Sequence, residues 1–193
     1  MLVTPVMAKK IYLNCHKTCL HFLMLLENLV SDRLRFRSLR ASDYEHWLPF
    51  VSDTASIRYL DISGSPEKAC RDWITRQQSR YRKDGFGLCA LEHLETGEFV
   101  GQCGLIRQLL NGKEEVEIGY SLLRPFYGKG YATEAASCCK NFAFANNVAP
   151  SLVSIVHENN TASQQVALRN GMRPDKKLTY HNLPVIVYRV YST

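Results

Sequence analysis

Hydrophobic and polar residues alternate in two separate parts of the chain, a pattern typical of half-buried β-strands. In RLRFRSL, Leu34 and Phe36 alternate with arginines. The stretch EEVEIGYSLL alternates in the same way, so we predict a strand with one apolar and one polar face. The apolar face carries Val116, Ile118, Tyr120 and Leu122, and the polar face carries Glu115, Glu117, Gly119 and Ser121.

Helical spacing marks four other segments. Ser42 and Asp43 supply the start of one helix, and Pro66 opens a second. A third follows the glycines of GKG, and a fourth is capped near Asn160 and closed by Gly171. The shared faces are predicted to hold Ala69, Trp73 and Gln77 in the second helix, and Ala132, Ala135, Ala136, Cys139 and Phe142 in the third.

The remaining apolar runs predict further strands. Two runs surround ETGE, which predicts a hairpin with Gly97 in its turn. SLVSIV predicts a short buried strand, and two final strands are joined at residues 181–184. The predicted order is strand, two helices, a meander of three strands, helix, strand, helix and two strands. No repeat or linker interrupts it, so we expect one α/β domain.

The N-terminal stretch CLHFLMLLENLV is nearly all apolar and departs from this pattern. Lysines precede it as in a signal peptide, but no small-residue cleavage site follows. It is also too short to span a bilayer. Three interpretations stay open: a helix packed on the domain, a partner interface, or a segment that is not normally translated, with Met24 as the start.

The same region contains CHKTCLH, which offers possible metal ligands. A zinc module has a second spaced pair of ligands, and none follows here. We therefore predict no metal site from Cys15, His16, Cys19 and His21.

Composition narrows the class of protein. A chain of 193 residues with 46% hydrophobic and 22% charged residues is long enough for one domain with a sizeable core. Seven cysteines without a regular framework predict reduced thiols and a cytoplasmic setting. The net charge of +6 suits nucleic acid, a ribosomal surface or a polyanionic small molecule, and charge alone does not choose among them.

The turn between the EEVEIGYSLL strand and the third helix is rich in glycine. Gly128 and Gly130 flank Lys129 just before the helix start. Glycine allows close approach to the main chain, and a helix start presents unpaired N–H groups, so the turn suits an anion such as phosphate. A tight turn with a solvated lysine is the alternative. The spacing fits neither a Walker loop nor a dinucleotide fingerprint.

Two motifs together resemble the GNAT superfamily of N-acetyltransferases, in the branch that contains the ribosomal-protein alanine acetyltransferases. EIGYSLLRPFYGKGYATEA resembles its acetyl-coenzyme A signature, and ENNTASQQVALRNGM resembles its second motif. The resemblance covers residues 33–193 and leaves 1–32 as an extension of uncertain role. It implies a single α/β domain with a mixed, mostly antiparallel sheet flanked by helices and splayed at the acetyl-CoA site. It also implies acetyl transfer to an amine by direct attack in a ternary complex.

The resemblance assigns cofactor contacts to positions. Leu122 and Leu123 would pair through their backbone with the pantetheine arm, as an added strand does. Asn160 and Ser163 would hydrogen-bond that arm from the other side, although Asn160 could instead simply cap its helix. The pyrophosphate would lie on backbone N–H groups of Tyr127, Gly128, Lys129, Gly130, Tyr131 and Ala132.

Catalysis needs a base for the amine and stabilisation of the thioester oxygen. The resemblance implies an N–H near Leu122 for the oxygen and Glu117 for the base, although Glu117 could be a solvated strand residue. Relatives often carry a tyrosine as general acid where this chain has Ala167. Tyr120 or Tyr127 would substitute, or the thiolate would leave unaided. Glu115 and Glu134 are weaker candidates for the base, and Cys138 and Cys139 are predicted to be core residues rather than nucleophiles.

The acceptor is open. The resemblance suggests a protein N-terminus, and a small amine is the other option, bound between the helices of residues 43–82 and the last strand pair. Trp47, Tyr59 and Trp73 either line that pocket or belong to the core. Two other classes remain: a non-catalytic acetyl-CoA sensor, or a module bound to ribosome or RNA through Arg33, Arg35, Arg37 and Arg40. We expect a monomer or homodimer with no membrane association.

Overall fold

The computed structural model describes residues 26–192 of the chain. Within them one sheet has the strand order β1-β2-β3-β4-β5-β7-β6. Neighbouring strands are antiparallel except β4 and β5, which are parallel, so the expected mixed and mostly antiparallel sheet is confirmed. The strands are β1 (Leu34–Arg37), β2 (Leu88–His93), β3 (Phe99–Leu110), β4 (Lys113–Leu122), β5 (Ser151–His157), β6 (Arg173–Tyr180) and β7 (Leu183–Tyr191).

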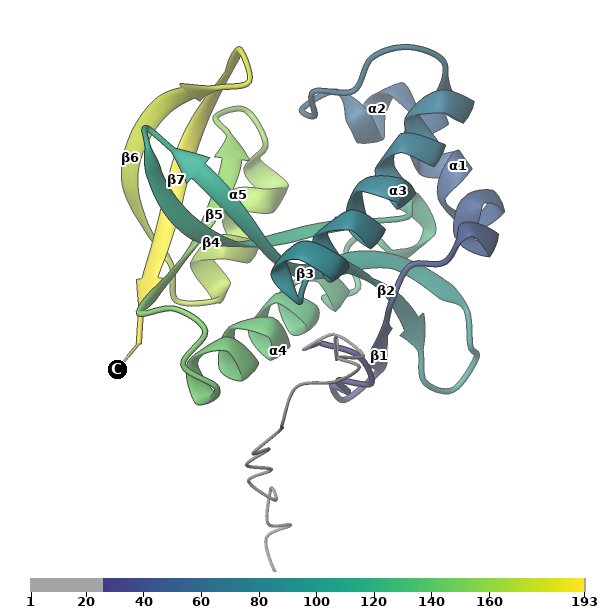
Figure 1. Ribbon diagram of the computed structural model, residues 1–193, viewed down its shortest axis with the longest axis horizontal. Coiled ribbons are helices and arrows are strands. Elements are labelled where there is room, and N and C mark those ends of the chain that lie inside the picture. Colours follow the sequence, from purple (N-terminus) through teal and green to yellow (C-terminus); the bar gives the residue numbers. More distant parts are fainter. Residues whose placement is uncertain (1–25, 193) are drawn as a thin grey trace, which may run out of the picture.

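Helices cover both faces of the sheet, with α1 and α3 on one side and α4 and α5 on the other (Figure 1). The predicted order of elements is confirmed, with one addition: a four-residue helix, α2, between the two expected helices. The Asp53 side chain caps it by accepting a hydrogen bond from the N–H of Ala55. The helices are α1 (Tyr44–Ser52), α2 (Thr54–Ile57), α3 (Pro66–Asp84), α4 (Tyr131–Ala145) and α5 (Thr161–Arg169), with 3₁₀ turns at Ala41–Asp43 and Arg124–Phe126.

The buried face of α3 differs from the prediction. Cys70, Ile74 and Gln77 are buried, at the spacing i, i+4, i+7, whereas Ala69 and Trp73 are only half-buried. Gln77 is therefore buried as predicted, whereas Cys70 and Ile74 take the buried places expected for Ala69 and Trp73. Trp73 lies at the margin of this buried face, because its indole N–H donates to the Oε1 atom of Gln102 on the sheet (2.8 Å).

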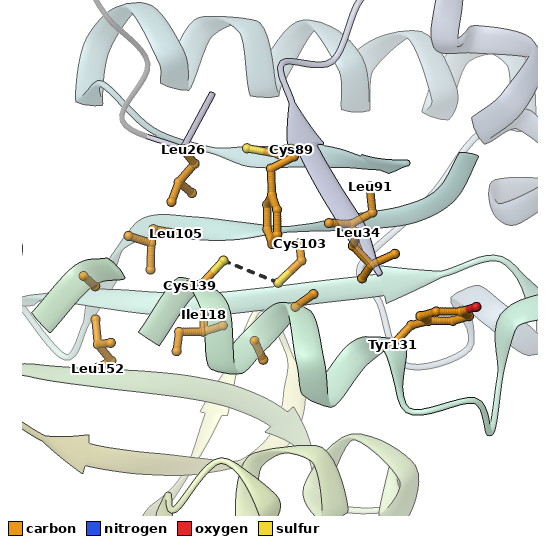
Figure 2. Packing of buried hydrophobic residues seen from close by; sticks show 14 of the residues in the cluster. Leu26, Leu34, Cys89, Leu91, Cys103, Leu105, Ile118, Tyr131, Cys139 and Leu152 are labelled. Atoms are coloured by element: carbon orange, nitrogen blue, oxygen red, sulfur yellow. Dashed lines mark hydrogen bonds between the residues drawn. The ribbon is translucent and has the colours of Figure 1, made fainter. Parts of the chain in front are cut away.

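Small side chains bring α4 close to the sheet. Ala135, Ala136 and Cys139 are buried where α4 contacts β3 and β4, whereas Ala132 and Phe142 of the predicted stripe are partly buried. Figure 2 shows Cys139 facing Cys103 of β3 in this core. A narrow helix face of alanine and cysteine lets the backbone approach the strands, which fixes where the helix begins relative to β4. The start of α4 is thereby held beside the end of β4.

The chain before β1 packs on this same core. Leu26 is fully buried in it (Figure 2), and the N–H of Asn28 donates to the carbonyl of Phe36. The Glu27 carboxylate accepts a hydrogen bond from the N–H of Ser38 (2.6 Å). The possible ligands Cys15, His16, Cys19 and His21, and the possible start at Met24, lie outside the described residues. Within residues 26–192, no helix combines the length and apolar character that a membrane span requires.

The sheet opens between its two parallel strands. Pairing of β4 with β5 is recorded at Glu117 and Val153. Beyond this point, within residues 26–192, the two strands have no further paired residues, and the Ser154 hydroxyl donates to the carbonyl of Ile118 (2.9 Å). The expected splay is therefore present, and it begins at Glu117.

Candidate active site

A cleft of about 740 Å³ lies at the splay and is lined by both halves of the chain. The connection from α1 to α3 and the helix α3 form one wall, and β5, the start of α5 and the β6–β7 turn form the other. The glycine turn closes one end, and Glu117 faces the interior. The structure thus brings the predicted cradle and the predicted base into one cavity.

The glycine turn presents open backbone to this cleft. Gly128 and Gly130 have φ angles of 73° and 85°, in the left-handed region that favours glycine. Gly130 is the N-cap of α4 and no side chain caps the helix. The first N–H groups of α4 therefore point at the cleft without partners inside the helix, together with the positive end of its dipole. This geometry suits a phosphate or diphosphate group.

Tyr127 differs from the rest of the predicted cradle. Its N–H donates to the carbonyl of Arg124 (3.1 Å), and its half-exposed side chain places the hydroxyl 3.1 Å from the Ser56 Oγ atom. The open N–H groups of the turn are consequently those of residues 128–132. Tyr127 instead links the turn to α2.

An ion pair holds the turn against the start of β1. The Arg33 guanidinium contacts Glu134 (2.6 Å), covers the Tyr131 ring and donates to the carbonyl of Lys129 (3.1 Å). Burial opposes ionisation of Glu134, but hydrogen bonds from Ser31 and Arg33 outweigh it and keep the pKa of Glu134 below its usual value. Glu134 is thus occupied in a structural contact, which weakens it further as a base candidate.

Glu115 is occupied in the same way. Arg189 binds both of its carboxylate oxygens (2.9 Å each), and this contact lowers the pKa of Glu115 despite its burial. The guanidinium also contacts Asp175 (2.9 Å). Glu115 therefore stabilises the β4–β7 side of the sheet and does not face the cleft.

Glu117 has a different environment. The Gln108 side-chain amide donates to its Oε2 atom (2.7 Å), and the Tyr180 hydroxyl donates in turn to the Oε1 atom of Gln108 (2.8 Å). Burial raises the pKa of Glu117, and Gln108, the backbone of Ile155 and the charge of Arg80 offset this only in part. A carboxylate with a raised pKa, oriented by an amide and facing a cleft, is suited to accept a proton.

The end of β4 offers backbone groups to the splay. The N–H of Leu123 donates to Val100 (3.0 Å) and its carbonyl accepts from Phe126, so both of its groups have partners. Because backbone groups alternate in direction along an antiparallel pair, those of Leu122 and Tyr120 point away from β3 and toward the splay. Of the two leucines predicted to pair with a ligand, only Leu122 therefore has backbone groups that point toward the splay and are free to pair.

Tyr120 lies between β4 and α5. Its hydroxyl donates to the carbonyl of Ser163 (2.8 Å), and burial raises the pKa of the phenol above its usual value. A phenol of raised pKa is a poor proton donor to a thiolate, whose own pKa is about 8.5. It remains a good hydrogen-bond donor. Ala167, at the place of the missing acid, is buried in the core.

Asn160 caps the start of α5. Its Oδ1 atom accepts a hydrogen bond from the N–H of Ser163 (3.2 Å), so the residue caps the helix. Asn160 and Ser163 both also line the cleft. The cap fixes the side-chain oxygen and leaves the amide group of Asn160 to contact a ligand.

The described cysteines lie away from this chemistry. Cys103 and Cys139 face each other in the core with their sulfur atoms 3.7 Å apart (Figure 2). Burial raises the pKa of the Cys139 thiol far above its usual value and that of Cys138 to about 11. At neutral pH neither is a thiolate, which supports the prediction of core residues rather than nucleophiles.

The three aromatic residues considered for the acceptor pocket occupy two different environments, the core and the cleft. Trp47 is fully buried and stacks on Phe50, so it belongs to the core. Tyr59 and Trp73 line the cleft. Tyr59 also crosses it, because its hydroxyl donates to the carbonyl of Asn159 (3.0 Å) and its ring stacks on His157.

The cleft also holds polar residues that the sequence did not predict as site residues, among them Gln108, Tyr180, Arg76 and Arg80. None belongs to a motif, and the position of each in the cleft depends on strands or helices that are distant in sequence. Gln108 and Tyr180 are 72 positions apart, for example. The only signal in the sequence for Gln108 was that it and Arg107 interrupt the apolar end of β3.

The four arginines proposed for RNA do not form a free patch. Arg37 contacts Asp43 (2.7 Å) and Glu92 (2.5 Å), and Arg33 contacts Glu134. β1 is an edge strand, and the outward side chain of Arg35 is exposed, as charged residues at sheet edges commonly are. Two of the four charges are thus already neutralised by the protein.

Comparisons with known proteins agree with this geometry. Residues 33–173 match the model of the acetyltransferase (GNAT) domain. The uncharacterized protein YkkB of Bacillus subtilis (strain 168) is 30% identical over 160 residues, covering 83% of this chain and 93% of YkkB. The crystal structure of an acetyltransferase from Agrobacterium tumefaciens str. C58 has a TM-score of 0.73 and 25% identity, covering 95% and 98% of the two chains. RimL, a ribosomal L7/L12 alpha-N-protein acetyltransferase in complex with coenzyme A, shares the fold with a TM-score of 0.67 at 19% identity, over 84% and 96% of the chains.

Proposed function

Because the chain belongs to the GNAT family of acetyltransferases, we propose that it transfers the acetyl group of acetyl-CoA to a primary amine in this cleft. The acceptor is a protein N-terminus or a small amine, and it attacks directly while both substrates are bound. The observation that carries the proposal is the position of Glu117 at the start of the splay, in the same cleft as the open N–H groups of the glycine turn.

The residues of the cleft fit acetyl-CoA, which would supply an activated acetyl group as a thioester. The N–H groups of residues 128–132 would hold the diphosphate, with the α4 dipole favouring its charge. The free edge of Leu122 would pair with the pantetheine arm, and Asn160 and Ser163 would contact it from the opposite wall. In this assignment Tyr127 and Leu123 support the turn rather than bind through their N–H groups.

Glu117 would take the proton that the amine loses as its nitrogen forms the new bond, directly or through a water molecule. The carbon–sulfur bond breaks, and the electron pair leaves with the sulfur. A backbone N–H at Tyr120 or Leu122 would stabilise negative charge on the carbonyl oxygen, because these groups face the splay. Gln108 holds the carboxylate in place, and Tyr180 holds Gln108.

Tyr120 would assist the departing sulfur by a hydrogen bond rather than by full proton transfer, and its one hydroxyl proton would have to turn from the carbonyl of Ser163 to do so. Tyr120→Phe is therefore expected to lower kcat by about tenfold, the effect of one hydrogen bond to a charged group, and not by the hundredfold or more of a lost general acid. The measurement is kcat for the best acceptor, with the affinity for coenzyme A as a control on folding. A fall of a thousandfold would show that Tyr120 is a true acid.

A sensor that binds acetyl-CoA without turnover is the second candidate, since Ala167 offers no acid. A panel of amines and short peptides, read by release of free thiol, separates the two. Steady release that depends on one acceptor supports the enzyme. Tight binding of acetyl-CoA without turnover across the panel supports the sensor.

The cellular setting is also part of the proposal. The five cysteines in the described residues are free thiols, which is consistent with a reducing, cytoplasmic location. We propose a monomer or homodimer without a metal cofactor. Contact with nucleic acid is expected only through a ribosome-bound acceptor.

A further inference from the structure

Two arginines project from α3 into the part of the cleft beyond Glu117. Arg76 and Arg80 are one helical turn apart, so their side chains lie on one face of the helix. The cleft is bordered there by Gln108, Tyr180 and His181. This wall belongs to the segments expected to receive the acceptor, opposite the glycine turn.

Among residues 26–192, neither arginine forms an ion pair with a carboxylate, although the charges of Glu117 and Asp84 act on Arg80 from a distance. In residues 26–192, Arg80 is half-buried and its recorded partner is the neutral Oε1 atom of Gln77 (3.2 Å), while Arg76 has no ion pair or hydrogen bond. Burial and the neighbouring charge of Arg76 both lower the pKa of Arg80. Elsewhere the protein pairs its buried arginines, as Arg37 and Arg189 show. Arg76 is exposed at the wall of the cleft, whereas Arg80 is half-buried, and a half-buried cation without an ion-paired carboxylate is costly unless a ligand brings an anion.

The position of Glu117 defines how such a ligand would lie. Its charge acts on Arg80 from across the cleft, although no direct ion pair joins the two side chains. A molecule between them would place its amine at the carboxylate of Glu117 and an anionic group at the guanidinium groups. The amine and the anion would then be only a few bonds apart.

The mouth of the cleft favours a small molecule. Asp61 of the α2–α3 connection lies 3.7 Å from His181 in the β6–β7 turn, and Tyr59 contacts Asn159 on the opposite wall. Both contacts cross the opening and narrow it.

Resting on the proposed acetyl transfer, we propose that the acceptor is a small zwitterionic amine, such as an amino acid, whose carboxylate binds Arg76 and Arg80 while its amine faces Glu117.

The test compares each common L-amino acid with its own carboxamide as acceptor, at saturating acetyl-CoA, by thiol release. The carboxamide has the same side chain and a more readily deprotonated amine, so only the lost carboxylate can disfavour it. For the best acceptor we expect kcat/KM to be at least tenfold higher with the free carboxylate, the effect of one charge-assisted contact.

Arg80→Gln and Arg76→Gln are expected to remove most of this preference and to leave the affinity for coenzyme A unchanged. Arg82→Gln is the matched control, because Arg82 is an exposed residue of α3 that does not line the cleft. It should behave as the wild type.

Each other outcome contradicts a different claim. Equal rates with acid and amide, or a preference that survives both arginine variants, would overturn the carboxylate site while acetyl transfer stands. Acetylation of acidic N-terminal peptides in strong preference to every free amino acid would overturn the small acceptor. Thiol release with none of the amines would remove the proposed function, and this inference with it.

Discussion

Gly130→Val is expected to weaken binding of coenzyme A by at least tenfold. Gly130 adopts a φ of 85°, which a β-branched residue does not accommodate without strain. A Cβ atom at this position would find space in the protein, since its nearest neighbour is the Arg33 Nη2 atom at 3.5 Å. The loss would therefore come from a shifted turn and a crowded phosphate site, rather than from a clash within the fold.

Titration calorimetry with coenzyme A measures this effect. Gly97→Val is a useful control, because Gly97 has a similar φ of 70° in the β2–β3 hairpin, remote from the cleft, and also has open space around it. Both variants carry the same backbone strain, but only the first should lose affinity. Unchanged affinity in folded Gly130→Val protein would remove the glycine turn from the binding site.

Glu117→Gln is expected to lower kcat by about a hundredfold or more and to keep the affinity for coenzyme A. Glutamine preserves the size of the side chain and can still accept the hydrogen bond from Gln108, but it cannot take a proton. The loss should shrink as the pH rises, because more of the amine is then already neutral. A kcat within about twofold of wild type at neutral pH, with chemistry rate-limiting, would exclude the base role.

The raised pKa of Glu117 gives this variant a second signature. Burial is the main cause of the shift, so the folded protein holds the proton more tightly than the unfolded chain. The contribution of the group to stability is then present below the ordinary glutamate pKa and is lost as the pH rises through the folded value. Glu117→Gln should therefore be at least as stable as wild type at neutral pH, with a gain that disappears in acid. Thermal unfolding of both proteins at neutral pH and at a pH below the ordinary glutamate pKa measures this difference in stability. A variant that is less stable than wild type at neutral pH would contradict a buried charge on Glu117.

The parts of the site that depend on local sequence were predictable. Two local patterns each span only a few residues. One is the pair of glycines at 128 and 130 before a helical stripe, and the other is a glutamate in an alternating strand. Alternation also placed the side chain of Glu117 on the correct face of β4, although the sequence could not distinguish a solvated from a buried carboxylate. That difference arises because α3 and the β6–β7 turn close over it.

Tertiary contacts decided the rest. Tyr127 and Leu123 matched the family motif, but their N–H groups are already bonded within the protein. The N–H of Tyr127 donates to the carbonyl of Arg124, and that of Leu123 donates to the carbonyl of Val100. Trp47 and Tyr59 looked equivalent in the sequence, yet packing placed one in the core and the other in the cleft. Arg80 belongs to no motif, and its place in the cleft wall depends on strands that are distant from α3 in the sequence.

The path of the acetyl group distinguishes direct transfer to the amine from transfer through the protein. Acetyl-CoA labelled in the acetyl carbon is mixed with excess protein, first without and then with the best acceptor, and the label is located by mass spectrometry. If transfer is direct, we expect an unlabelled protein in the first step, and in the second a labelled acceptor formed at the same rate as free thiol. Label bound covalently to the protein before the acceptor is added, or label that never reaches an amine although acetyl-CoA is bound, would contradict direct transfer in this cleft.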